Sequence, residues 1–264
     1  MTAHEPKVCG GERSRSAQGY SEYLELPRLL ALQRPLGDPF VPDEMLFIIV
    51  HQAHELWFKQ ILLELRLLIA HLEHAEWSDA AAKMDRINRI FRLLTGHLEI
   101  LATMPPAEFQ KFRPALGSAT GMQSEQYREI ERVVGEPASR APSALGGRAE
   151  QSVRSALRSA VSAAQSAEGA AANPDPNSLG QVVANLLRDP ERAPERAVAE
   201  RLIEFDVQIA RWRMAHVDLA RLMIGGACGT GGSSGVSYLQ QAVDRRFFPE
   251  LDGLLPPPSV LPSS

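Results

Sequence analysis

A histidine on an otherwise apolar helix face is the first residue in this sequence that could do chemistry. Residues 205–224 carry large side chains at alternating spacings of four and three, which is the repeat of one helix face, and His216 falls on that face. The apolar members are Phe205, Ile209, Trp212, Leu219 and Met223. Gly225-Gly226 is expected to end the helix, and residues 229–235 then form a loop of glycines and hydroxyl side chains. This combination suits a flat, apolar, metal-centred cofactor with polar edges.

The histidine on the apolar helix face and the Gly/Ser loop each have a simpler explanation. A histidine on an apolar stripe is more often a hydrogen-bonded core residue than a ligand, and a Gly/Ser loop can be a flexible linker. The loop is not a Walker A phosphate-binding loop, because no Gly-Lys-Ser/Thr follows it and no β-strand pattern precedes it. Taken alone, the stretch leaves both interpretations open.

Two further histidines, His51 and His54, lie three residues apart beside Glu55. The sequence HQAHE is neither HExxH nor its reverse, and no third ligand follows at a useful spacing, so it does not predict a zinc site. An imidazole in an apolar pocket can instead act as a hydrogen-bond partner or as a base. Since burying two unpaired histidines would be costly, at least one of the pair is expected to have a polar role.

Arg113 is the candidate for binding an anion. It follows Phe109 by four residues on a predicted short helix, so the two side chains point the same way, and the Gly/Ser turn GSATG follows. A guanidinium beside an aromatic ring suits a substrate carboxylate. An ordinary surface arginine would give the same pattern, so the spacing alone does not decide.

Hydrophobic periodicity predicts the helices that must position these residues. No period-two strand pattern exceeds background, so the sequence predicts an all-α fold. We expect a mobile tail over 1–18 and a single domain over 19–264. Two long helices are expected to start at Asp43 and at Ser78-Asp79 as capping residues, and the helix over 148–164 is expected to have little to bury. The expected helices are 20–32, 43–73, 78–103, 107–116, 122–134, 148–164, 179–187 and one that runs from Glu195 into the His216 stripe.

Composition narrows the class of protein. The 264 residues are 44% hydrophobic with a net charge of −4, which indicates a globular chain. No basic stripe with interleaved aromatic residues points to nucleic acid, and no apolar run is long enough to span a membrane. With two cysteines and no apolar signal segment, the expected location is cytoplasmic.

Three blocks of the sequence resemble the tryptophan 2,3-dioxygenase family of histidine-ligated, heme-dependent aromatic oxygenases. They are HQAHELWFKQILLELR, FRPALGSATGMQSEQYREIE and WRMAHVDLARLMIGGACGTGGSSGVSYLQQA, and they occur in family order. With the 20–32 segment and FFPEL near the C-terminus, they cover most of the chain outside 136–200. The resemblance implies an all-α helical bundle with heme b buried between helices, usually assembled as a homotetramer, with a homodimer as the smaller alternative.

The resemblance also assigns residues to the site. It implies that His216 is the axial ligand of the heme iron and that His51 is the catalytic histidine contacting the indole N–H. Phe47 and Phe109 would line the indole pocket, and Arg113 would pair with the substrate carboxylate. Further substrate contacts would come from Thr230 and from Tyr20, Tyr23 and Leu24 of a neighbouring subunit, and further heme contacts from Trp212, Gly121 and Gly231. Cys228 lies where relatives have residues that are not ligands, so it ranks below His216.

The reaction implied is the addition of O2 across the indole C2–C3 bond of L-tryptophan, or of a methylated tryptophan, to give an N-formylkynurenine-type product. Two departures keep an alternative open: region 136–200 is expected to be shorter than the cover found in typical members, and Gly-Ala-Cys occupies 226–228. A differently closed site could insert one oxygen only, giving a 2-oxindole-type product from a substituted tryptophan in natural-product biosynthesis. A heme- or tryptophan-binding protein without turnover and a structural helical bundle are the rivals from other classes.

Overall fold

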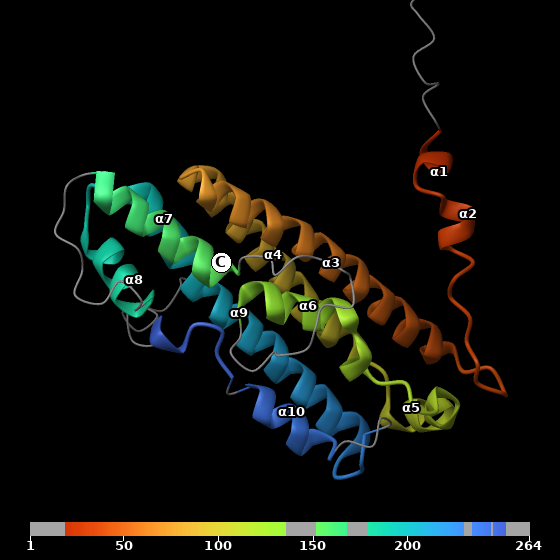
Figure 1. Ribbon diagram of the computed structural model, residues 1–264. Coiled ribbons are helices and arrows are strands. Elements are labelled where there is room, and N and C mark those ends of the chain that lie inside the picture. Colours follow the sequence, from red (N-terminus) through yellow and green to blue (C-terminus); the bar gives the residue numbers. More distant parts are fainter. Residues whose placement is uncertain (1–18, 136–151, 168–178, 230–233, 244, 252–264) are drawn as a thin grey trace, which may run out of the picture.

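The computed structural model describes residues 19–135, 152–167, 179–229, 234–243 and 245–251 (Figure 1). The described residues form helices and turns without a strand, which confirms the predicted all-α fold. None of the described helices combines the length and the apolar character needed to cross a bilayer.

Three long helices form the centre of the bundle: α3 (Pro42–Glu73), α4 (Trp77–Leu101) and α9 (Ala193–Ile224). Helix α4 packs between α3 and α9 (Figure 1), and the core between them is built from fully buried rings and aliphatic chains such as Leu65, Phe91 and Phe205. A long helix can be held this way because most of its stability comes from burying its apolar face.

Shorter helices cover this centre along its length. Helices α6 (Glu125–Val134) and α7 (Val153–Ala167) pack on α3, and α8 (Leu179–Arg188) packs on α9. Helices α5 (Pro106–Phe112) and α10 (Val236–Val243) also pack against α9. The single-turn helices α1 (Tyr20–Tyr23) and α2 (Leu26–Leu29) stand away from the bundle (Figure 1). Three 3-10 turns complete the description: η1 (Arg113–Leu116), η2 (Gly121–Gln123) and η3 (Pro249–Leu251).

The predicted starts of the two long helices are wrong by one or two residues. Helix α3 begins at Pro42 with Val41 as its N-cap, and Asp43 lies inside the first turn. Proline is favoured there because its φ is already helical and its missing N–H would have had no partner in the helix. Helix α4 begins at Trp77, ahead of the predicted Ser78-Asp79 cap, and the buried Trp77 ring packs in the core.

Three predicted helices are divided by local chemistry. The helix expected over 20–32 forms α1 and α2, with Glu25 between them at a φ of +50°. The helix expected over 107–116 is α for residues 106–112 and 3-10 from Arg113 onward, because Pro114 has no N–H to continue the α pattern. The helix expected over 122–134 is preceded by the turn η2. Ser124 then caps α6, its hydroxyl accepting a hydrogen bond from the Tyr127 N–H at 3.1 Å.

The expectation that the helix in region 148–164 buries little is wrong. Helix α7 buries Val153, Leu157 and Val161, each at no more than 1% exposed, and Ala156 and Ala160 are buried beside them. Residues 148–151 lie outside the described residues. The small alanines let α7 approach its neighbours closely, so an alanine-rich helix still contributes to the core.

Asp206 ties residues 245–248 to the bundle. This buried carboxylate of α9 accepts hydrogen bonds from the backbone N–H groups of Phe247 and Phe248, at 2.9 and 2.8 Å. Burial raises the pKa of Asp206, and the two amide donors oppose that shift. The Arg213 guanidinium lies 5.1 Å from the Phe247 ring centroid and donates to the Arg245 carbonyl at 2.6 Å.

We expect Asp206→Ala to destabilise the protein by about 2–5 kcal/mol, because two buried amide N–H groups lose their acceptor at a cost of about 1–3 kcal/mol each. Asp85→Ala, which removes an exposed i,i+4 pair with Arg89, is the matched control and should change stability by no more than about 0.5 kcal/mol. Urea unfolding monitored by circular dichroism measures both. Equal midpoints for the two variants would contradict the role given to Asp206.

Candidate active site

One cavity lies at the end of the bundle where α5, α10 and the last turns of α9 meet. Its walls are mainly apolar, and they come from α3, α4, α5, α9 and α10 together with the turns η1 and η2. Six residues predicted for the site line it: Phe47, His51, Phe109, Arg113, Gly121 and His216. Residues separated by more than 150 positions in the sequence thus meet in one place.

His216 is positioned by the last third of α9 and faces this cavity. Its pKa is lowered to about 4, first by burial and then by the nearby imidazoles of His51 and His54, so the ring is neutral at pH 7. Within the described part of the chain, no group donates to or accepts from this ring in a hydrogen bond. A neutral imidazole with an unused lone pair beside an apolar cavity is what metal ligation requires.

His51 lines the same cavity from α3. Its Nδ1 lies 2.7 Å from the carbonyl oxygen of Phe47, and because a carbonyl only accepts, Nδ1 carries the proton and Nε2 is left as an acceptor. Burial lowers the pKa of His51, while the Phe47 carbonyl and the Glu55 charge oppose that shift. The Phe47 ring lies 4.1 Å from the imidazole and also contacts Phe109 at 6.0 Å, so the histidine is bordered by aromatic walls.

Arg113 lies at the start of η1, on the cavity wall, where its Nη2 donates to the Cys228 carbonyl at 2.6 Å. This bond joins η1 to the loop that follows α9. Gly235, which precedes α10, adopts a φ of +64°, and a Cβ added there would lie 2.5 Å from the Ala227 carbonyl oxygen, so only glycine fits this position. Arg113, Gly229 and Gly235 all line the cavity.

Trp212, predicted as a cofactor contact, is not among the residues that line the cavity. It lies behind His216, with ring centroids 6.1 Å apart, and its Nε1 donates to Nε2 of His54 at 3.3 Å. Trp212 is 9% exposed and surrounded by aromatic rings. The spacing of four residues correctly places Trp212 and His216 on the same helix face. It cannot show which of the two side chains lines the cavity.

Tyr20, Tyr23 and Leu24 are far from the cavity of their own chain. They belong to α1 and its C-cap, and the two tyrosines are 76% and 74% exposed. The structure therefore does not bring these predicted substrate contacts to the site within one chain. Thr230 and Gly231 lie outside the described residues.

Several lining residues were not predicted as part of the site. Leu101, Met104, Tyr238 and Leu239 line the cavity because the end of α4 and the start of α10 meet α9 there. No local spacing signals this, since it depends on how three helix ends are brought together.

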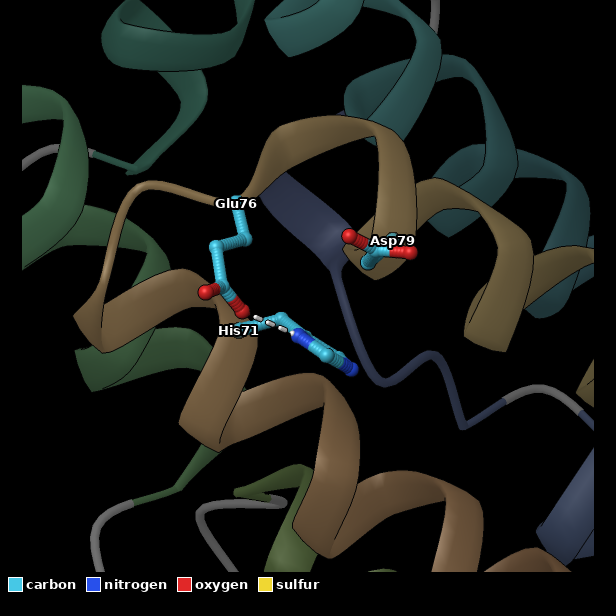
Figure 2. Close-up of side chains that lie close together, drawn as sticks. All are labelled: His71, Glu76 and Asp79. Atoms are coloured by element: carbon cyan, nitrogen blue, oxygen red, sulfur yellow. Dashed lines mark hydrogen bonds and ion pairs between the residues drawn. The ribbon is translucent and has the colours of Figure 1, made fainter.

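A second group of possible metal ligands lies at the turn between α3 and α4. Figure 2 shows His71, Glu76 and Asp79, with Nδ1 of His71 2.6 Å from a Glu76 carboxylate oxygen. Glu76 and Asp79 are exposed, and none of the three lines the cavity. The hydrogen bond between His71 and Glu76 spans the turn, where Ala75 adopts a φ of +56°, and these residues lie outside the cavity lining.

Comparison with known proteins decides the family. The family model described as tryptophan 2,3-dioxygenase matches residues 5–144 and 148–254. The chain belongs to the tryptophan 2,3-dioxygenase family. It is 36% identical over 252 residues to a tryptophan 2,3-dioxygenase of Bacillus anthracis, covering 88% of this chain and 90% of the relative. It is also 36% identical over 255 residues to one of Xanthomonas oryzae pv. oryzae (strain PXO99A), covering 88% and 85%.

Membership makes the protein a heme-dependent oxidoreductase and confirms heme b as its cofactor. The described residues fit this group. The cavity is mainly apolar, as a porphyrin face requires, and the neutral His216 ring faces it without a hydrogen-bond partner among those residues. Gly121 in the cavity wall has no atom within 4 Å of an added Cβ, so the wall is open at this turn.

Proposed function

We propose that the protein oxygenates the indole ring of L-tryptophan across C2–C3 with O2, inserting both oxygen atoms to give an N-formylkynurenine-type product. The observation that carries the proposal is the convergence of one unpaired neutral imidazole, one acceptor imidazole and one guanidinium on a single apolar cavity. An indole needs apolar walls and one acceptor for its N–H, and an amino acid needs one cation for its carboxylate.

His216 is proposed to hold the heme iron from the α9 side. When bound, the heme supplies the binding and activation of O2. The protein supplies the axial imidazole and keeps the surrounding cavity apolar. A neutral His216 is required at working pH, and its lowered pKa of about 4 meets that requirement.

Phe47, Phe109 and His51 are proposed to bind the indole. The two rings both line the cavity, with their centroids 6.0 Å apart, and offer flat apolar walls. Because Nδ1 of His51 is committed to the Phe47 carbonyl, Nε2 is the atom that accepts the indole N–H. This contact would fix which edge of the indole faces the heme. It would also keep the indole N–H hydrogen-bonded to His51 during the reaction.

Arg113 is proposed to bind the carboxylate of the amino acid. In the described structure its guanidinium is engaged by the neutral Cys228 carbonyl, which a carboxylate would replace with a stronger, charge-assisted bond. Thr230, in the adjoining loop, is the proposed second contact to the ammonium and carboxylate groups.

The chain is proposed to act as a homo-oligomer, a tetramer or a dimer. Tyr20 and Tyr23 are exposed and distant from their own cavity, which suits a segment that reaches a neighbouring subunit. The outward face of α3 also exposes Ile49, Leu56 and Leu63 at intervals of seven residues, at 48, 58 and 48%. A repeated apolar stripe of this kind favours burial against a second copy. A cytoplasmic location is the setting proposed for this assembly.

Product mass after turnover in ¹⁸O2 tests the proposed reaction. We expect the heme-loaded, reduced protein to convert L-tryptophan into a ring-opened product that carries two labelled oxygens. A single labelled oxygen, with turnover that depends on an added reductant, would identify a monooxygenase giving a 2-oxindole-type product instead. A β-methylated tryptophan assayed in parallel tells whether a substituted substrate is preferred, and no O2 consumption on any indole would identify a binding protein.

We expect His216→Ala to abolish stable heme binding, because the iron loses its only proposed protein ligand. The Soret absorbance per protein after heme reconstitution and gel filtration measures this. His74→Ala, which removes an exposed histidine at the end of α3, is the control and should bind heme like the unaltered protein. Equal heme content in His216→Ala and His74→Ala would rule out the ligand assignment.

We expect Arg113→Ala to raise KM for L-tryptophan by about 10- to 100-fold, the range that follows from losing a hydrogen bond to a charged group. KM for free 3-methylindole, which has no carboxylate, should change far less. Arg113→Lys keeps the charge but loses the two-pronged geometry. Its KM for L-tryptophan should therefore lie between those of the unaltered protein and Arg113→Ala. If both substrates are affected to the same extent, Arg113 does not bind the carboxylate.

A further inference from the structure

A hydrogen bond between His54 and Trp212 connects α3 to the back of the His216 ring. His54 is 7% exposed, and its Nδ1 lies 2.8 Å from the Val50 carbonyl oxygen. A carbonyl can only accept, so Nδ1 carries the proton and Nε2 is the acceptor that receives the Trp212 Nε1–H at 3.3 Å. The Val50 carbonyl of α3 thus fixes the tautomer of His54 in which Nε2 can accept the hydrogen bond from Trp212.

Trp212 is confined on several sides. Besides the bond to His54, its ring contacts Phe58 at 5.9 Å, Phe91 at 6.1 Å and Tyr127 at 5.3 Å between centroids. These rings come from α3, α4 and α6, so the plane of the indole is set by three other helices. The hydrogen bond adds direction, because packing alone leaves a ring free to slide in its own plane.

The confined indole is stacked with His216. The two ring planes are inclined by 29°, with centroids 6.1 Å apart. A ligand histidine is commonly oriented by a hydrogen bond from its second ring nitrogen. Among the described residues no such partner reaches His216, and the neighbouring face of Trp212 is placed to restrict rotation of the imidazole.

We infer that His54 is a positioning residue, which orients the His216 ring by holding Trp212 in place through their hydrogen bond. The inference rests on the proposed role of His216 as the iron ligand. His54 touches neither the cavity nor the reacting atoms, and it acts through Trp212. The angle at which the His216 imidazole meets the iron would then depend on His54, which lies 162 positions earlier in the chain.

Resonance Raman spectroscopy of the ferrous holoenzyme tests this directly, because the iron–histidine stretching band reports the orientation and strength of the axial bond. We expect His54→Leu, which has no acceptor, to shift or broaden that band. Heme transfer to excess apomyoglobin should become faster by about 10- to 100-fold, the range found when outer partners of metal ligands are removed. His54→Gln, whose amide oxygen can still accept from Trp212, should remain close to the unaltered protein in both measurements.

Two further variants separate the hydrogen bond from packing. His97→Leu alters a neighbouring ring, 5.5 Å from His54, that makes no hydrogen bond to Trp212, and should leave the band unchanged. Trp212→Phe keeps a ring against His216 but removes the donor, so it should resemble His54→Leu. Because both changes remove the same bond, the double variant should show little more than either single variant.

The outcomes distinguish this inference from the proposed function. An unchanged band and heme-release rate in His54→Leu, or equal effects of His54→Gln and His54→Leu, would overturn the positioning role. If His54→Leu does not fold, Trp212→Phe carries the same test, and an unchanged band there would also overturn it. An iron–histidine band that survives in His216→Ala would instead reject the proposed ligand, whatever the His54 variants show.

Discussion

The packing of α9 against α4 is the constraint on which the rest of the structure depends. Helix α9 is 32 residues long and is buried against α4 through rings such as Phe205 and Phe91, 5.6 Å apart. That burial fixes the axis and the rotation of the helix. His216 therefore faces the cavity because this apolar interface sets the direction of its side chain.

The irregular segments around the cavity are fastened to α9 by polar bonds. Gln110 of α5 donates to the Met223 carbonyl at 2.8 Å, and Arg113 donates to the Cys228 carbonyl at 2.6 Å. Met223 lies in the last turn of α9, where helix carbonyls have no intrahelical partner, and the bond from Gln110 satisfies its carbonyl. Cys228 lies four residues beyond the helix, and the bond from Arg113 joins the segment after α9 to η1.

Sequence patterns predicted the fold class and grouped the central residues of the site, but they misplaced the ends of helices. Periodicity placed His216 on the buried face of a helix, and the motif resemblance grouped it with His51 and Arg113. Helix ends were misplaced where a proline or a buried tryptophan overrode capping preferences, as at Pro42 and Trp77. The packing around His216 could not be predicted. That Trp212 does not line the cavity and bonds to His54 depends on the meeting of α3 and α9, which no spacing within either helix encodes.

The charge distribution of the cavity explains why an amphiphilic substrate suits it. His216 and His51 both have lowered pKa values, so neither adds positive charge to the apolar interior near pH 7. Among the described residues that line the cavity, Arg113 is the one permanent cation, and it lies at the wall formed by the loop after α9. An uncharged aromatic ring loses little by entering such an interior, whereas a carboxylate would be stable only beside Arg113. The cavity therefore orients a molecule that is apolar at one end and anionic at the other, and the apolar end is directed toward the two histidines.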